Sequence, residues 1–165
     1  MKVFLVRHAV AHERSRTRWP NDSLRPLTPA GKRKFRKAAR GLMTLLPKSA
    51  VLLTSPYVRA RDTAAILAKV MRHSKPIECH ELASGQPPEK AFELLRSRKD
   101  QTLVLVGHEP GLSNFLSAAL TIEHSRLRIE FKKGGAACID FPGRVEPARA
   151  TLEWLAPPRM LRALK

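Results

Sequence analysis

Two short apolar runs, each followed by a histidine, limit what this chain can fold into more than any other feature. Residues 3–6 lead into Arg7 and His8, and residues 103–106 lead into a glycine and then His108. Uninterrupted β-branched and aliphatic runs of this length are typical of strands that are buried on both faces. In open α/β sheets, reactive groups lie just beyond the carboxyl ends of such strands. We therefore expect the two histidines to share one crevice, although a lone histidine in such a position more often only hydrogen-bonds locally.

Strands and helices alternate from the N-terminus to residue 120. Apolar runs predict strands at residues 2–6, 50–54, 76–79 and 102–106. Apolar residues at helical spacing predict four helices, which begin after Thr28, Ser55, Pro87 and Pro110 and end near residues 47, 71, 98 and 120. This alternation predicts an α/β fold, namely a three-layer α/β/α sandwich with a mainly parallel central sheet.

The last third of the chain has a different pattern. Residues 136–141 and 150–155 are separated by prolines and a glycine, which predicts an antiparallel pair at the C-terminal edge of the sheet. Residues 127–131 are a candidate for a further strand. No repeat or linker interrupts the chain, so we expect residues 1–165 to form a single domain.

The formal net charge of +17 is concentrated in the first half. Residues 1–75 hold 18 Lys and Arg against three acidic residues, a net +15, whereas residues 76–165 hold 13 against 11, a net +2. Such a basic face attracts an anionic partner, which leaves phosphoprotein, polyphosphate and nucleic acid open. The helix after Thr28 is the densest part, with Lys32, Arg33, Lys34, Arg36, Lys37 and Arg40. A solvated face usually mixes charge signs, and here almost no acidic residue is interleaved.

Several classes of protein and of site do not fit the sequence. No apolar run is long enough to span a membrane, and the N-terminus lacks the pattern of a secretory signal, so we expect a cytoplasmic protein without a membrane partner. Cys79 and Cys138 lack the spacing of a metal site or a disulfide framework. There is no P-loop, no Gly-rich dinucleotide motif and no carboxylate cluster suited to Mg²⁺, so we expect no metal and no cofactor.

Arg59 is the third strong candidate for the crevice. It lies in the first turn of the helix that opens at Ser55-Pro56, together with Arg61. The positive end of a helix dipole disfavours cations and suits an anion, so an arginine there strengthens an anion site at a cost in stability. Arg61 is expected at the surface. With Arg7, His8 and His108, Arg59 makes a site for a dianion, and neutral imidazole is a competent nucleophile for metal-free phosphoryl transfer.

At this point the chain resembles a known family through four motifs in order. They are Leu5-Val6-Arg7-His8, Arg25-Pro26-Leu27-Thr28 with Gly31, Ser55-Pro56-x-x-Arg59-Ala60-x-x-Thr63-Ala64, and Val106-Gly107-His108. Together they resemble the histidine phosphatase (phosphoglycerate mutase-like) superfamily. The run from Asp22 to Thr28 and the compact length most resemble its SixA branch of phosphohistidine phosphatases. Ala9 departs from members that carry glycine there, which crowds the turn slightly.

The resemblance implies a role for each site residue. His8 would be the nucleophile, and Arg7, Arg59 and His108 would hold the phosphoryl oxygens. Arg25 and the backbone N–H of Glu109 would add donors for phosphate.

The general acid stays open between Glu81, Asp22 and neither of them, because each carboxylate also fits a structural ion pair. The remaining histidines are expected to be surface or locally hydrogen-bonded residues, namely His12, His73, His80 and His124.

The leading hypothesis is therefore a metal-independent phosphatase that acts on phosphohistidine in a signalling protein of the histidine-containing phosphotransfer type. One alternative is a phosphatase of small phosphomonoesters or polyphosphate. Another is a non-catalytic module that binds a polyanion. Nucleic acid is disfavoured as a partner because aromatic residues, which stack on bases, make up only 5% of the chain.

Overall fold

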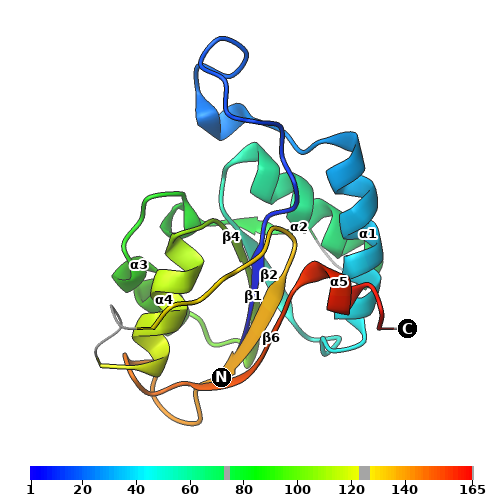
Figure 1. Ribbon diagram of the computed structural model, residues 1–165. Coiled ribbons are helices and arrows are strands. Elements are labelled where there is room, and N and C mark those ends of the chain that lie inside the picture. The colour runs from blue at the N-terminus through cyan, green and yellow to red at the C-terminus, as the bar shows by residue number, and fades with distance from the viewer. Residues whose placement is uncertain (73–74, 123–126, 165) are drawn as a thin grey trace.

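A six-stranded sheet forms the centre of the computed structural model, which describes residues 1–72, 75–122 and 127–164 (Figure 1). The strand order is β3-β2-β4-β1-β5-β6. Four parallel strands make up one part, namely β1 (Lys2–Arg7), β2 (Val51–Thr54), β3 (Ile77–Glu78) and β4 (Thr102–Gly107). The antiparallel edge consists of β5 (Ala136–Asp140) and β6 (Thr151–Ala156). The mainly parallel sheet and its antiparallel C-terminal edge are confirmed.

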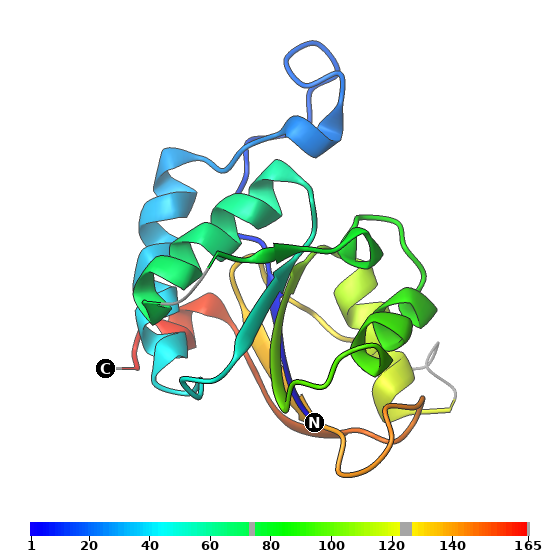
Figure 2. The ribbon, with the colours of Figure 1, turned by 180° about the vertical axis from the view of Figure 1, so that it is seen from behind.

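Helices cover both faces of this sheet (Figures 1 and 2). One layer holds α1 (Pro29–Met43), α2 (Val58–Met71) and the short α5 (Pro158–Leu161), and the other holds α3 (Pro88–Arg96) and α4 (Gly111–Leu120). Alternate side chains of one strand point to opposite layers, so in β1 Phe4 and Val6 pack in the core under α1 and α2, while Val3 and Leu5 pack in the core under α3 and α4. This arrangement confirms the three-layer α/β/α sandwich. No described helix is long and apolar enough to cross a membrane.

The start of α1 is joined to the chain that follows β1. The Thr28 hydroxyl oxygen accepts a hydrogen bond from the Gly31 N–H at 2.9 Å, as expected for a helix N-cap. A β-carbon at Gly31 would lie 2.1 Å from the carbonyl oxygen of Val10, so only glycine allows the helix to approach so closely. An antiparallel bridge between Ala11 and Leu27 closes the base of the intervening loop. The loop itself projects from the sheet (top of Figure 1) and contains a 3-10 turn, Asp22–Leu24.

The structure corrects one predicted strand and the C-terminal ends of two predicted helices, of which α3 ends at Arg96 rather than near residue 98. Residues 127–131 are not a strand. The position beside β1 is occupied by β5, and the Phe131 carbonyl accepts a hydrogen bond from the Arg7 side chain rather than from the backbone of a neighbouring strand. The first helix ends at Met43 rather than at residue 47, with Thr44 as its cap. The C-terminal tail, expected only as a short basic segment, contains α5, whose Leu161 is buried in the core beside α1.

Candidate active site

The register of the sheet brings three residues together at its carboxyl edge. The central strand β4 has β1 on one side and β2 on the other, and Arg7 pairs with Gly107 while Thr54 pairs with Val106. The residues that follow these pairs are His8, His108 and Ser55, so they lie side by side. The His8 N–H donates to the Gly107 carbonyl at 3.0 Å, and the two imidazole ring centroids lie 5.1 Å apart. The expectation of one shared crevice is therefore met in the geometry.

A cavity of ≈ 380 Å³ opens over these strand ends. Its walls combine the end of β1, the projecting loop, the start of α2 and the segment after β4. They are lined by Arg7, His8, Ala11, His12, Glu13, Arg14, Arg25, Arg59, Ser84, His108, Glu109 and Lys133. Four arginines, one lysine and two acidic residues give these walls an excess of positive charge, which suits a phosphoryl group.

His8 is held as a neutral imidazole with one free nitrogen. It is 6% exposed, and its Nδ1 lies 2.7 Å from the carbonyl oxygen of Ala9, which requires Nδ1 to carry the proton. No described residue hydrogen-bonds its Nε2, so the lone pair of Nε2 is available to a ligand in the cavity. Burial, opposed by the bond to Ala9 and reinforced by Arg59 and Arg7, lowers the pKa of His8 to about 3. The ring is therefore neutral at neutral pH, with its single proton on Nδ1.

His108 is neutral as well, but its environment differs. Its Nε2 lies 2.7 Å from the hydroxyl of the fully buried Ser55, and that hydroxyl also accepts from the Tyr57 N–H at 3.3 Å. We assign the serine hydroxyl as the donor to Nε2, because it already accepts from Tyr57, and this assignment puts the imidazole proton on Nδ1. Burial, followed by the neighbouring His8 and Arg59, lowers the pKa of His108 to about 2. Nδ1 is buried and has no partner within the described residues.

Arg7 at the end of β1 and Arg59 in the first turn of α2 are anchored and still have unused donors. Arg7 donates from Nη1 to the Phe131 carbonyl at 2.6 Å, and Arg59 donates from Nη1 to the Asp22 carbonyl at 2.8 Å. The Nε atoms of both arginines are buried without a partner among the described residues. Burial lowers the pKa of the Arg59 guanidinium, and the Asp22 carboxylate opposes that shift. Buried donors normally have partners, so these orphaned N–H groups beside the cavity indicate a site built for an anion.

Asp22 is bound into ion pairs with the arginines around it. Its carboxylate lies 2.7 Å from Arg25 Nε, 3.1 Å from Arg59 Nη1 and 3.9 Å from Arg14 Nε. The hydrogen bond from Arg25, together with the charges of Arg59 and Arg25, lowers the pKa of Asp22. A carboxyl group with a lowered pKa is a poor proton donor, so the geometry favours the ion-pair alternative for Asp22. Arg25 itself is 7% exposed and also donates to the His12 carbonyl at 2.7 Å.

Glu81 and Glu109 come from two other segments near the site, the turn after β3 and the residues that follow β4. Glu81 is half-buried in the 3-10 turn His80–Leu82, beside a small recess that also borders Ser84 and His108. Glu109 lines the cavity, and its carboxylate accepts hydrogen bonds from the backbone and hydroxyl of Ser113. The Glu109 N–H has no hydrogen-bond acceptor among the described residues, which leaves it available to a phosphoryl oxygen.

Sequence reasoning missed several side chains at the site. Lys133 lines the cavity because the Gly134 N–H donates to the carbonyls of Arg7 and His8, a contact that no local motif announces. His12 was expected at the surface, yet it lines the cavity and its ring lies 6.1 Å from that of Trp19. The Tyr57 ring lies 5.0 Å from the Arg59 guanidinium and 5.1 Å from the His108 ring.

Other sequence expectations concern residues away from the cavity. His80 is exposed, and so is Arg61, which lies 3.5 Å from Glu78. His73 and His124 lie outside the described residues. Cys79 and Cys138 are both buried free thiols. Within the described ranges, no three His, Cys, Asp or Glu side chains are grouped so that they could hold a metal ion.

Comparisons with known proteins agree with this arrangement. The family model of the histidine phosphatase superfamily (branch 1) matches residues 3–83. An uncharacterized protein of Picosynechococcus sp. is 30% identical over 142 residues, which cover 82% of each chain. The structure of the protein histidine phosphatase SixA complexed with tungstate superimposes with a TM-score of 0.82 at 21% identity, covering 98% of this chain and 99% of that one. A putative phosphohistidine phosphatase SixA from Agrobacterium tumefaciens gives a TM-score of 0.74 at 24% identity, covering 95% and 97%.

Proposed function

Because this chain belongs to the histidine phosphatase superfamily, we propose that it is a phosphohistidine phosphatase that removes the phosphoryl group from a histidine of a signalling protein. The observation that carries the proposal is the state of His8. Its Nδ1 is tied to the Ala9 carbonyl, its pKa is lowered to about 3, and its free Nε2 belongs to a cavity lined by four arginines. A neutral nucleophile among fixed cations is the arrangement that metal-free phosphoryl transfer requires.

The proposed reaction has two steps. In the first, the lone pair of His8 Nε2 attacks phosphorus, a new N–P bond forms, and the N–P bond to the substrate imidazole breaks with its electron pair going to that imidazole. In the second, water attacks the phosphorus of the phosphorylated His8, the N–P bond to Nε2 breaks, and inorganic phosphate is released. His8 returns to its starting tautomer because Nδ1 keeps its proton throughout.

Four groups are proposed to hold the phosphoryl oxygens. The Nε donors of Arg7 and Arg59 and the Nδ1 donor of His108 are buried and unpaired among the described residues. The Glu109 N–H supplies the fourth donor, and Arg25 adds positive charge behind Asp22. Fixed donors aimed at the equatorial oxygens stabilise the charge that develops in the transition state, without reorganisation during the reaction.

A phosphohistidine substrate needs less help from a general acid than a phosphate ester does, which supports it as the substrate here. An imidazole leaving group carries its own ring proton, whereas an alkoxide leaving group needs a positioned acid. Asp22 is held as a carboxylate by Arg25 and Arg59, whereas Glu81 has no ion-pair partner among the residues that the structure describes. The two SixA structures compared above are named for activity on protein histidine or phosphohistidine, which agrees with this choice.

A phosphatase of small phosphomonoesters or polyphosphate is the second candidate. It is favoured by the basic residues of the projecting loop, since Arg14 lines both the cavity and a neighbouring hollow of ≈ 500 Å³ that also borders Arg16 and Trp19. Such a hollow would accept further anionic groups of a longer substrate.

Initial rates on three substrates separate these candidates. The substrates are a histidine-phosphorylated phosphotransfer domain, a sugar phosphate and polyphosphate. We expect the highest kcat/KM on the phosphorylated domain, and loss of that activity in His8→Ala. A higher kcat/KM on the sugar phosphate or on polyphosphate would overturn the assignment of phosphohistidine as the substrate.

A further inference from the structure

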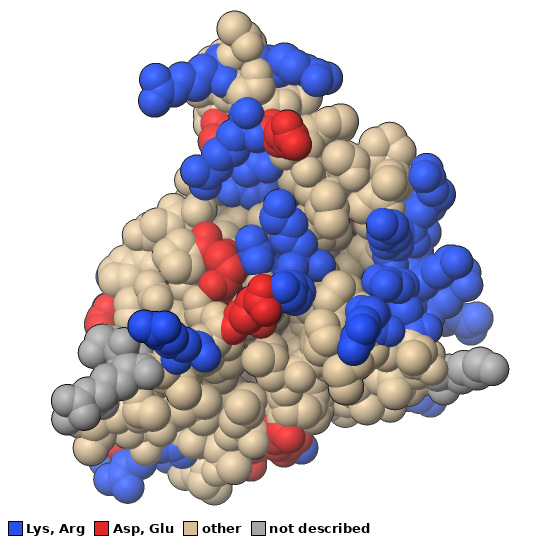
Figure 3. Space-filling model, in the orientation of Figure 1, with Lys and Arg blue, Asp and Glu red and all other residues tan. Residues whose placement is uncertain are grey.

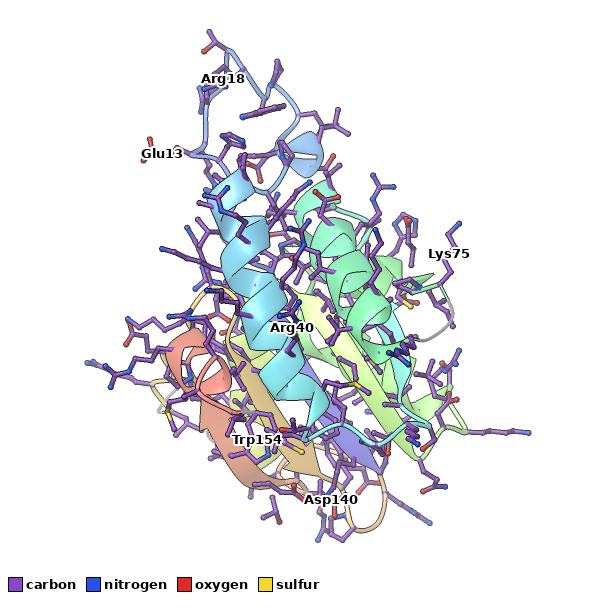
Figure 4. The ribbon with its side chains drawn as sticks, turned by 90° about the vertical axis from the view of Figure 1, so that its right-hand side faces the viewer. Glu13, Arg18, Arg40, Lys75, Asp140 and Trp154 are labelled. Atoms are coloured by element: carbon purple, nitrogen blue, oxygen red, sulfur yellow. The ribbon has the colours of Figure 1, made fainter. Side chains whose placement is uncertain are left out.

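Five exposed cations on α1 form a surface that the proposed chemistry does not use. Arg33, Arg36, Lys37 and Arg40 recur at intervals of three and four residues, which places them on one side of the helix, and Lys34 lies beside them. They are called the α1 cationic surface below. Figure 4 looks onto this helix and shows Arg40 on its exposed side. From Arg33 to Arg40 the surface extends for about 10 Å along the helix axis.

No described carboxylate lies within ion-pair distance of these five side chains. The neighbouring Lys32 does have a partner, Asp62 at 2.9 Å. The first turn of α1 contains no acidic residue to balance the helix dipole, and among the cations of the surface only Arg40 lies in the last turn, where the dipole favours positive charge. Like charges three and four residues apart destabilise a helix further. The α1 cationic surface therefore works against the stability of its own helix, which argues for a partner that neutralises it.

The α1 cationic surface adjoins the face that contains the cavity. The chain enters α1 directly from the Ala11–Leu27 bridge, and Ala11 lines the cavity. In Figure 3, Lys and Arg gather on one face at the projecting loop, at the centre and along the flank formed by α1. A macromolecule that places a phosphoryl group in the cavity can therefore contact α1 at the same time.

We propose that the α1 cationic surface docks an acidic face of the phosphorylated protein whose phosphohistidine enters the cavity. This inference rests on the proposed function, and it adds where the substrate protein binds and with what chemistry. Complementary charges on the two proteins would raise the rate of encounter and fix the orientation of approach. Because the helix is rigid, its charges present a fixed spacing that an acidic helix can match.

Nucleic acid fits the same surface less well than a protein. Sequence-tolerant binding of single strands combines a basic groove with exposed aromatic rings. The aromatic residue of α1 is Phe35, which is 2% exposed and packs into the core. The α1 cationic surface thus offers charge without stacking, which suits carboxylates of a protein.

A charge-matched pair of variants tests the docking site. The test variant is Arg33→Gln, Arg36→Gln, Lys37→Gln, Arg40→Gln. The control variant is Lys99→Gln, Arg128→Gln, Arg144→Gln, Arg149→Gln, which removes the same charge from exposed positions away from α1. Steady-state rates are measured on an acidic, histidine-phosphorylated phosphotransfer domain and on free phosphohistidine, each at low and moderate salt.

The expected result is selective. The test variant raises KM for the phosphorylated domain by about tenfold at low salt, with kcat unchanged, because it loses steering and not chemistry. Its kcat/KM on free phosphohistidine stays at the wild-type value, and the control variant behaves as wild type on both substrates. Added salt reduces the difference in KM for the phosphorylated domain between the test variant and wild type, since exposed charges are screened within about 10 Å at 0.1 M ionic strength.

Three outcomes would overturn the docking site. They are an unchanged KM in the test variant, an equal rise in the control variant, and a loss of polyphosphate or RNA binding in the test variant without any effect on the phosphorylated domain. If wild type hydrolyses neither phosphohistidine substrate, the proposed function fails instead. The docking site is then judged by direct binding of the unphosphorylated acidic domain, and equal affinity for wild type and the test variant would reject it.

Discussion

The hydroxyl of Ser55 lies 2.7 Å from Nε2 of His108, and both residues are buried. The donor assigned to this contact, the Ser55 hydroxyl, places the proton of His108 on Nδ1. With the Ser55 hydroxyl donating to Nε2, Nδ1 carries the proton and has no partner among the described residues, which makes it the donor to the phosphoryl group in the proposed mechanism. In that mechanism Ser55 is a positioning residue, which acts on the substrate only through His108.

Ser55→Ala is expected to weaken phosphate binding through this tautomer. Loss of the hydroxyl leaves Nε2 buried without a partner, at a cost of about 1–3 kcal/mol in the free energy of unfolding. We expect the inhibition constant of orthovanadate, a phosphate mimic, to rise by about tenfold, which corresponds to about 1.4 kcal/mol. Thr44→Ala is the matched control, because it removes a hydroxyl that donates to the Gly41 carbonyl on the far end of α1. Equal vanadate inhibition in both variants would reduce Ser55 to a purely structural role.

The two buried histidines make the fold sensitive to acid. The pKa of His8 is lowered to about 3 and that of His108 to about 2, whereas an unfolded histidine titrates near 6.5. Between these values the unfolded chain binds more protons, so stability is full above about pH 6.5 and falls as the pH decreases, by about 1.4 kcal/mol per pH unit for each histidine. Urea unfolding of wild type and His8→Gln from pH 7.5 to 4.5 measures this slope. The free energy of unfolding of the variant is expected to depend less steeply on pH, by about 1.4 kcal/mol per pH unit, because one histidine is missing. Parallel curves for the two proteins would contradict the lowered pKa of His8.

Asp22→Asn is expected to lower the rate of hydrolysis of every substrate by a similar factor. The substitution keeps the shape of the side chain and removes the charge that holds Arg25 and Arg59, the latter at 3.1 Å. We expect kcat/KM to fall by about tenfold whatever the leaving group, with the basic limb of the pH profile unchanged. Asp62→Asn, which removes the partner of Lys32 on the α1–α2 side, is the control. A selective loss on alkyl phosphates together with a lost basic limb would instead identify Asp22 as the acid.

Glu81→Gln is expected to discriminate between leaving groups. A positioned acid contributes about 10²-fold to expulsion of an alkoxide, whereas an imidazole leaves without that help. The variant is therefore expected to lose about 10²-fold in kcat on a sugar phosphate and to keep most of its rate on phosphohistidine. Glu78→Gln, which lies in β3 and pairs with the exposed Arg61, controls for charge. Equal losses on both substrates would remove Glu81 from the role of acid.

The parts of the fold that were predictable from sequence are those encoded locally. Residues 3–6 and 103–106 are apolar without interruption because they lie in β1 and β4 at the middle of the sheet, covered on both faces. The cap at Thr28 and the unfavourable position of Arg59 were equally local signals. They were sufficient to place His8, His108 and Arg59 at one edge of a parallel sheet.

The remaining features depend on contacts between distant segments. The order of the strands, with β4 between β1 and β2, places Ser55 against His108. Neither of the apolar runs, residues 3–6 and 103–106, indicates this order. Lys133 reaches the cavity only because Gly134 hydrogen-bonds to the end of β1. Residues 127–131 have an alternating pattern compatible with a strand, yet the place beside β1 is taken by β5. Side-chain pairing likewise decided the state of Asp22, because its arginine partners come from both the loop and α2.

Trapping of the phosphorylated enzyme tests directly whether His8 is the nucleophile. Wild type, His8→Ala and His12→Ala are mixed briefly with a histidine-phosphorylated domain, quenched in alkali and mapped by mass spectrometry for the site of phosphorylation. We expect an acid-labile phosphoryl group on His8 in wild type and in His12→Ala, and neither phosphorylation nor turnover in His8→Ala. Full activity of His8→Ala, or a phosphoryl group on any other residue, would contradict this assignment of the nucleophile.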